Sequence, residues 1–96
     1  MSRLSLAPLA PNPWRDATRV RFVIPASSAG AHAAVRVYDP AGRLVTTLAD
    51  ETMAAGPHDV AWSGLDGHAR RVSAGVYFVR LEAGDAVLTR RTVVLR

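Results

Sequence analysis

Apolar and polar side chains alternate with a period of two along most of this chain. In TRVRFVIP, Val20, Phe22 and Ile24 alternate with arginines, and Pro25 ends the run. Because successive side chains of an extended strand point to opposite faces of a sheet, this pattern predicts a strand with one buried face. Similar runs occupy residues 33–38, 43–49, 58–62, 75–82 and 86–96.

The alternation also predicts which residues form the core. In the last run it places Val93 and Leu95 on the same face as Arg91. Met53, in a predicted loop over 50–57, is expected to reach back into the core. The predicted core is Val20, Phe22, Ile24, Val35, Val37, Val60, Trp62, Tyr77, Val79, Leu81, Val93 and Leu95.

Two Asp-containing segments predict turns. In residues 39–42, DPAG, the Asp39 carboxylate is expected to accept backbone N–H groups and Gly42 to adopt a positive φ, which makes a hairpin of 33–38 and 43–49. Residues 63–74 form a polar connection, in which Asp66 is expected to hold a tight turn in the same way.

Short strands separated by turn signals every 8–12 residues, with no sustained helical pattern, favour an antiparallel β-sandwich. A chain of 96 residues has the length of one domain, so we predict a single domain over 1–96. Residues 1–16 form a Pro-rich lead-in, in which Trp14 is expected to fold onto the edge of the sandwich.

Composition narrows the chemistry. The chain is 49% hydrophobic and 21% charged, as ordinary globular proteins are, and it has no cysteine, which excludes disulfides and thiolate ligands. No run of 18 apolar residues predicts a membrane-spanning helix, so no membrane insertion is expected. The N-terminus lacks a signal-peptide core, so the chain either stays inside the cell or is one piece of a larger exported precursor.

The net charge is +4, and all 12 of the Lys and Arg residues are arginine. Arginine binds phosphate and guanine edges, so a nucleic-acid partner is one interpretation. The arginines are scattered and mostly alternate with apolar residues, whereas a phosphate-binding footprint is clustered. We therefore expect no nucleic-acid partner, and the Arg bias agrees with the codon usage of a GC-rich genome.

Ser63, His58 and either Asp59 or Asp66 include the residue types of a nucleophilic triad. His58 and Ser63 are five residues apart, which places them on opposite faces of a strand, and no G-x-S-x-G elbow surrounds Ser63. The sequence therefore predicts no catalytic residues and no enzyme.

Two groups of residues are candidates for a metal site. His58, His68 and Asp66 could bind zinc, but no helical i, i+4 pair holds them together. The loops at Asp39 and Asp66 could bind calcium, but neither contains an alternating run of oxygen ligands. We expect no metal and no cofactor.

A longer motif runs through nearly the whole chain, residues 8–96. It reads PNPW, TRVRFVIP, VRVYDPAGRLVTTL, AGPHDVAWSGLDGHARRVSAGVYFVRLEAGD and RRTVVLR. This series resembles the C-terminal sorting domains of type IX secretion substrates, which are similar to the Ig-like domain of the flagellar hook-capping protein. The residues on the pattern are Asn12, Pro13, Pro25, Tyr38, Asp39, Gly42, Arg43, Gly56, His58, Trp62, Gly64, Asp66, Val72, Gly75 and Tyr77.

The chain departs from the pattern at three positions. Trp14 stands where the family usually has Phe, Ser63 replaces an Asp, and Ala69 replaces a turn Gly. The last two further weaken the case for a cation at this loop. Tyr77 is expected to act as a tyrosine corner, its hydroxyl bonding the backbone a few residues upstream.

The resemblance implies an all-β, seven-stranded Ig-like sandwich in two sheets. It also implies a non-catalytic C-terminal module of a larger exported bacterial protein, acting as a folded sorting signal at the cell surface. Its partners would be the secretion apparatus and an N-terminal passenger domain. An alternative is a structural or interaction module with self-association through edge strands, and a carbohydrate-binding sandwich using Trp14 is a third.

The terminal strand is the segment that is predicted to bind such a partner. At a sheet edge, its free N–H and C=O groups could pair with a partner strand, and its arginines would add charge steering. The predicted recognition residues are Arg90, Arg91, Val93, Val94, Leu95 and Arg96.

Overall fold

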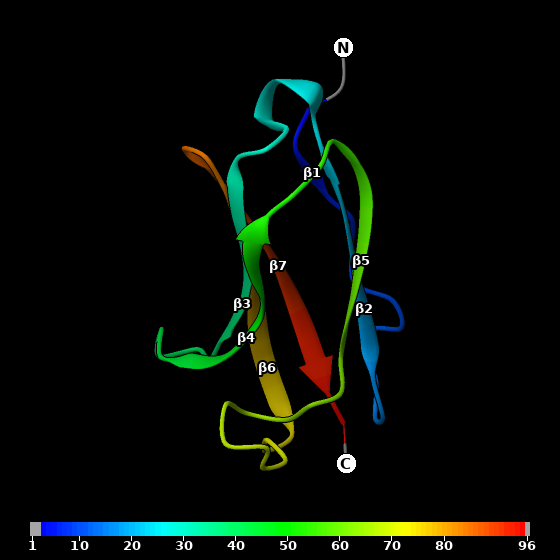
Figure 1. Ribbon diagram of the computed structural model, residues 1–96. Coiled ribbons are helices and arrows are strands. Elements are labelled where there is room, and N and C mark those ends of the chain that lie inside the picture. Colours follow the sequence, from blue (N-terminus) through cyan, green and yellow to red (C-terminus); the bar gives the residue numbers. More distant parts are fainter. Residues whose placement is uncertain (1–2, 96) are drawn as a thin grey trace.

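The computed structural model describes residues 3–95 and is an antiparallel sandwich of two sheets (Figure 1). One sheet has the strand order β1-β2-β5 and the other has the order β4-β3-β6-β7. The predicted all-β fold with seven strands in two sheets is confirmed. The strands are β1 (Ser5–Leu6), β2 (Thr18–Ile24), β3 (His32–Tyr38), β4 (Leu44–Thr52), β5 (Gly56–Trp62), β6 (Gly75–Ala83) and β7 (Ala86–Val94), with one 3-10 turn, η1 (Ala26–Ser28).

The core lies between the two sheets, and most of the residues that the alternation predicted to be buried lie in it. Met53, which follows β4, is also buried, as predicted. Val60 is only partly buried, because it lies on β5 at the margin of its sheet. The predicted core residues that are buried are Val20, Phe22, Ile24, Val35, Val37, Trp62, Tyr77, Val79 and Leu81.

The predicted buried face of the last strand is wrong. Tyr77 faces the core and pairs directly with Thr92, so Thr92 and Val94 point inward. Val93 lies on the outer face and Leu95 is exposed. Apolar residues occur at both parities between 87 and 95, so the alternation could not decide the face, and pairing with β6 decided it.

The Pro-rich lead-in is packed into the sandwich, whereas the sequence predicted only that Trp14 folds onto its edge. Its two-residue strand β1 pairs with β2, and Leu6, Leu9 and Trp14 are buried. This short strand was not predicted, because two residues are too few to show a period.

The predicted loop over 50–57 is shorter than expected. β4 continues to Thr52 and β5 begins at Gly56. The pairing of His32 with Thr52 extends the hairpin with β3, across two register shifts. Tertiary pairing therefore imposes strand structure on residues 50–52, whose polar composition suggested a loop.

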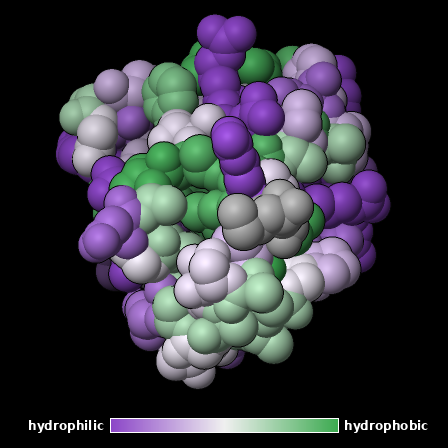
Figure 2. All heavy atoms as spheres, turned by 90° about the horizontal axis from the view of Figure 1, so that it is seen from above, coloured by the Kyte–Doolittle hydropathy of each residue, from purple (hydrophilic) through white to green (hydrophobic). Residues whose placement is uncertain are grey.

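Figure 2 shows the end of the sandwich near η1, where hydrophobic residues are visible in a recess between the hydrophilic residues around it. Over residues 3–95, no helix is long and apolar enough to cross a membrane.

Candidate partner-binding site

β7 is the outermost strand of the four-stranded sheet, and the lead-in runs along its free edge. The side-chain amide of Asn12 makes two hydrogen bonds to it: Nδ2 donates to the Arg91 carbonyl at 3.2 Å, and Oδ1 accepts from the Val93 amide at 2.9 Å. Two residues on, the Trp14 amide donates to the Val93 carbonyl at 3.0 Å, and the Trp14 carbonyl accepts from the Leu95 amide at 2.7 Å. Residues 12–14 thus close this part of the edge.

The prediction that the terminal strand offers free backbone groups is therefore wrong for its C-terminal half. Four of the outward-facing groups that a partner strand would need, the Arg91 carbonyl, the amide and carbonyl of Val93 and the Leu95 amide, are already bonded to Asn12 and Trp14. A backbone group that is already hydrogen-bonded gains little from pairing with a new strand. This pairing was not predictable from the sequence, because the bonded residues are about eighty positions apart.

Trp14 fixes the lead-in to the core. Its side chain is only 3% exposed, its ring meets Trp62 edge-on at 5.1 Å, and its Nε1 donates to Thr92 Oγ1 at 2.8 Å. Gly64 makes room for the ring, since a Cβ at Gly64 would lie 3.3 Å from Trp14. Trp14 is thus a core residue rather than an exposed platform on which a sugar could stack.

The predicted recognition residues of β7 divide between two faces. Arg91, Val93 and Leu95 lie on the outer side of the sheet. Val94 is buried, and Arg90 turns to the lead-in, where its Nε donates to the Leu6 carbonyl at 2.8 Å. The remaining predicted residue, Arg96, lies outside the described residues.

The segments DPAGR and DGHAR form two loops with the same bonding. Asp39 Oδ1 accepts from the amides of Ala41 and Arg43, both at 2.9 Å. Asp66 Oδ1 accepts from the amides two and four residues on, at 2.8 and 3.0 Å. The predicted capping role of both Asp residues is confirmed. An open groove of about 1000 Å³ lies between the loops.

The two loops differ at their fourth position. Gly42 has φ +85° and Ala69 has φ +60°, the left-handed region that costs a residue with a Cβ about 1–2 kcal/mol. Ala69→Gly should therefore raise the free energy of unfolding by about 1 kcal/mol, and Gly42→Ala should lower it by a similar amount. Urea denaturation of both variants measures this. Destabilisation by Ala69→Gly would show that Ala69 is not strained.

Backbone hydrogen bonds also shift the acidity of these carboxyl groups. The amide of Arg43 holds the pKa of Asp39 below its ordinary value, and the amides of Arg70 and His68 do the same for Asp66. Hydrogen bonds to the charged form favour that form. Both loops therefore depend on ionised carboxylates.

Because the pKa of both groups is lower in the folded state, the unfolded state takes up protons first as the pH falls. The stabilisation should be complete above about pH 5 and should disappear as the pH falls below about 4, through the folded pKa values. Urea midpoints measured from pH 7 to pH 2 test this. The double variant Asp39→Asn, Asp66→Asn keeps the turn acceptors and should show a shallower decline, and an unchanged decline would assign acid sensitivity to other carboxyl groups.

Tyr77 makes the predicted tyrosine corner. Its hydroxyl donates to the Ser73 carbonyl at 2.7 Å, and its ring meets Trp62 edge-on at 5.5 Å. Tyr77→Phe should lower the free energy of unfolding by about 1 kcal/mol, because it leaves that carbonyl without this donor. Tyr38→Phe, on the outer face, is the matched control and should change it by less than about 0.5 kcal/mol. Equal effects in thermal denaturation would contradict the corner.

His58 and Ser63, which were considered as catalytic residues, have separate surroundings. His58 Nε2 contacts the Ala54 carbonyl at 2.8 Å and its ring stacks on Phe22, whereas Ser63 is exposed at the start of the next loop. Within residues 3–95, no three His, Asp or Glu side chains gather into a group that could hold a metal ion.

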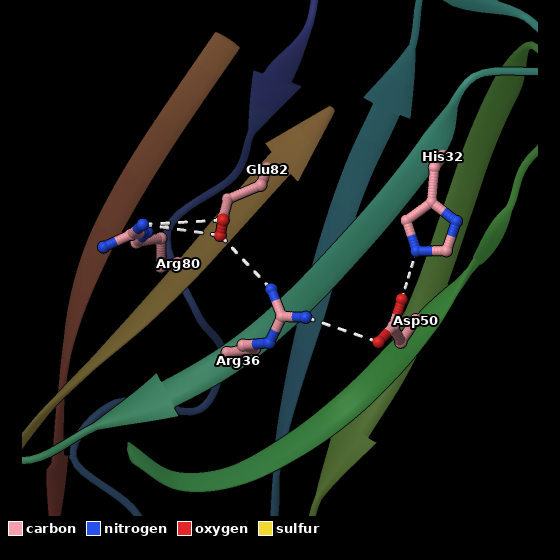
Figure 3. Close-up of polar contacts among 5 residues, drawn as sticks. All are labelled: His32, Arg36, Asp50, Arg80 and Glu82. Carbon is pink, nitrogen blue, oxygen red and sulfur yellow. Dashed lines mark hydrogen bonds and ion pairs between the residues drawn. The ribbon is translucent and has the colours of Figure 1, made fainter. Parts of the chain in front are cut away.

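A polar ladder that the sequence did not reveal crosses the outer face of the four-stranded sheet (Figure 3). Arg36 is its centre and pairs with Asp50 at 3.3 Å and with Glu82 at 3.2 Å. His32 also contacts Asp50, and Arg80 pairs with Glu82 at 3.4 Å. The ladder joins β3, β4 and β6 and uses the carboxylates of Asp50 and Glu82.

Comparisons with known proteins agree with this geometry. A family model described as the FlgD Ig-like domain matches residues 12–86. The crystal structure of dimeric latent PorU from Porphyromonas gingivalis is similar with a TM-score of 0.73 and 20% identity, over 99% of this chain and 10% of that chain. At that identity the likeness shows the fold alone, and this chain spans about a tenth of the PorU chain. No curated protein matches the chain.

These findings support the resemblance drawn from the motif. The family match begins at Asn12, the residue that closes the edge of β7, and covers both Asp loops and the tyrosine corner. Because it spans well over half of the residues, the chain belongs to the FlgD Ig-like domain family.

Proposed function

We propose that this chain is a non-catalytic module of a larger exported bacterial protein and acts as a folded sorting signal for type IX-like export. One observation supports the proposal: 99% of the chain superposes on a region that makes up 10% of PorU, as expected if this fold serves as one module of a larger protein. The proposed partners are the secretion apparatus and a passenger domain, and the proposed location is the cell surface or the medium.

The physical properties of the domain suit such a role. A signal read in the folded state needs a rigid scaffold and side chains that remain exposed on it. The two-sheet core and the bonded lead-in supply the scaffold. Arg91 and Leu95 stay exposed at the end of the terminal strand.

The test is a fusion of a signal peptide, a passenger enzyme and residues 1–96, expressed in a bacterium that has type IX machinery. The passenger should reach the surface or the medium, and it should stay in the periplasm in a strain without the outer-membrane channel of that system. Deleting only residues 90–96 is a poor control, because it removes the buried Thr92 and Val94 and would unfold the domain. Retention of the intact, folded fusion in the periplasm would contradict the proposal.

The family match favours a second candidate, a structural Ig-like module of an extracellular assembly such as a hook cap. That role predicts binding to an assembly partner without export of a fused passenger. The same fusion distinguishes the two roles, since only a sorting signal changes the location of the passenger.

A further inference from the structure

The outer face of the four-stranded sheet divides into two chemically different parts. The part toward β4 carries the polar ladder. The part formed by the start of β6 and the end of β7 carries apolar side chains, and there Val76 lies directly opposite Val93. Phe78, the next outward residue of β6, lies opposite Arg91. We call Val76, Phe78, Val93 and Leu95 the apolar patch.

The patch is accessible to a partner. Val76 is 36% and Leu95 is 37% exposed, whereas Phe78 and Val93 are partly buried beside them. Side chains directly opposite on adjacent strands lie about 5 Å apart, so the three strand residues form one continuous surface. Apolar side chains that are contiguous and partly exposed can contribute the apolar part of an interaction site when a polar group beside them adds specificity.

The charge beside the patch has no ion-pair partner among residues 3–95. Arg91 is exposed, and none of the carboxylates in the described part of the chain forms an ion pair with it. The carboxylates of the same sheet face, Asp50 and Glu82, are bonded to Arg36 and other members of the ladder. An unpaired arginine next to apolar side chains is complementary to a surface that carries a carboxylate and apolar groups.

The closed edge of β7 restricts how a partner can approach. Asn12 and Trp14 bond the Arg91 carbonyl, both backbone groups of Val93 and the Leu95 amide, so an added strand cannot pair with these groups without displacing the lead-in. The side chains of Arg91, Val93 and Leu95 remain on the outer face, whereas those of Thr92 and Val94 are buried. Recognition of the folded domain at this end therefore uses side chains rather than the strand edge.

We propose that the apolar patch and Arg91 form a docking face for a protein surface that offers apolar side chains and a carboxylate. This inference rests on the proposed function, in which the partner belongs to the export apparatus. It adds Val76 and Phe78 of β6 to the recognition surface and removes Arg90 and Val94, which turn away from it.

The export fusion tests the docking face with exposed single substitutions. Arg91→Glu, Val76→Asp and Leu95→Asp should each lower export of the passenger by about tenfold or more, as the loss of a central contact does in other interfaces. Arg91→Lys should keep most of the export, because it keeps the positive charge. Thermal denaturation of each purified domain, within a few degrees of the wild type, verifies that the variants fold.

Two matched controls make the same types of substitution outside the patch. They separate an effect of the position from an effect of the substituted side chain itself. Val87→Asp makes the same change as Val76→Asp on the same sheet face, at a residue of β7 that is 52% exposed and about 20 Å from Val93. Arg3→Glu makes the same charge reversal at an exposed residue just before β1, which belongs to the other sheet. Both controls should be exported as the wild type is.

The outcomes are distinct. Loss of export in the three patch variants, with both controls exported, supports the docking face. Normal export of the folded patch variants overturns it and leaves the proposed function intact, whereas retention of the wild-type fusion overturns both. A dimer of the purified domain in sedimentation that dissociates on Arg91→Glu would also overturn the proposal, because the face would then bind a second copy.

Discussion

Replacing Trp14 with alanine should lower the free energy of unfolding by about 3–5 kcal/mol. The substitution removes the largest side chain of the lead-in from a site that is only 3% exposed, and with it the edge-on contact to Trp62. It also leaves Thr92 Oγ1 without the indole donor. Guanidinium denaturation, followed by the fluorescence of the remaining Trp62, measures the effect.

Trp14→Phe is the matched control for this prediction. Phe is the usual residue of the related motif, and it keeps an aromatic ring against Trp62 while losing the donor to Thr92. The loss should be about 1–2 kcal/mol, clearly less than for alanine. A loss below about 1 kcal/mol for Trp14→Ala would mean that the lead-in is not anchored in the core.

Replacing Asn12 with alanine should lower the free energy of unfolding by about 2 kcal/mol, because two hydrogen bonds to β7 disappear at once. The local effect should be larger than the global one at the Val93 amide, which loses its acceptor. Hydrogen exchange at that amide, measured by NMR, should become faster by about tenfold or more. The amide of Val79, in the centre of the sheet, should change only as global stability does.

Asn12→Asp separates the two bonds of the side chain. The carboxylate still accepts from the Val93 amide, but it has no donor for the Arg91 carbonyl and places a negative charge beside it. We expect Asn12→Asp to keep the Val93 amide protected from exchange but to be almost as destabilising as Asn12→Ala. Equal exchange rates in the wild type and in Asn12→Ala would show that Asn12 does not close the edge of β7.

The local chemistry of the chain was predictable from short segments. The alternation around Val20, Phe22 and Ile24 identified a half-buried strand, because a period of two is a property of extended backbone itself. Asp39 and Asp66 were predictable as turn residues, because their carboxylates bond amides only two and four positions ahead. The hydroxyl of Tyr77 likewise reaches only four residues back.

Features that join distant parts of the chain were not predictable in this way. The alternation in β7 fits either face, and the wrong face was assigned to Val93 and Leu95. The role of Asn12 depends on bonds to residues about eighty positions away. The polar ladder around Arg36 likewise depends on a register that only the paired strands reveal.

The sequence by itself determined the longer strands, the Asp turns and the family, because these depend on local spacing and on a motif that runs along the chain. The tertiary structure decided what the terminal strand presents to a partner. Pairing of Tyr77 with Thr92 sets which side chains of β7 face outward, and Asn12 and Trp14 close its backbone edge. A period of two shows that neighbouring side chains point to opposite faces of the sheet. Only the register with another strand shows which of the two faces is buried.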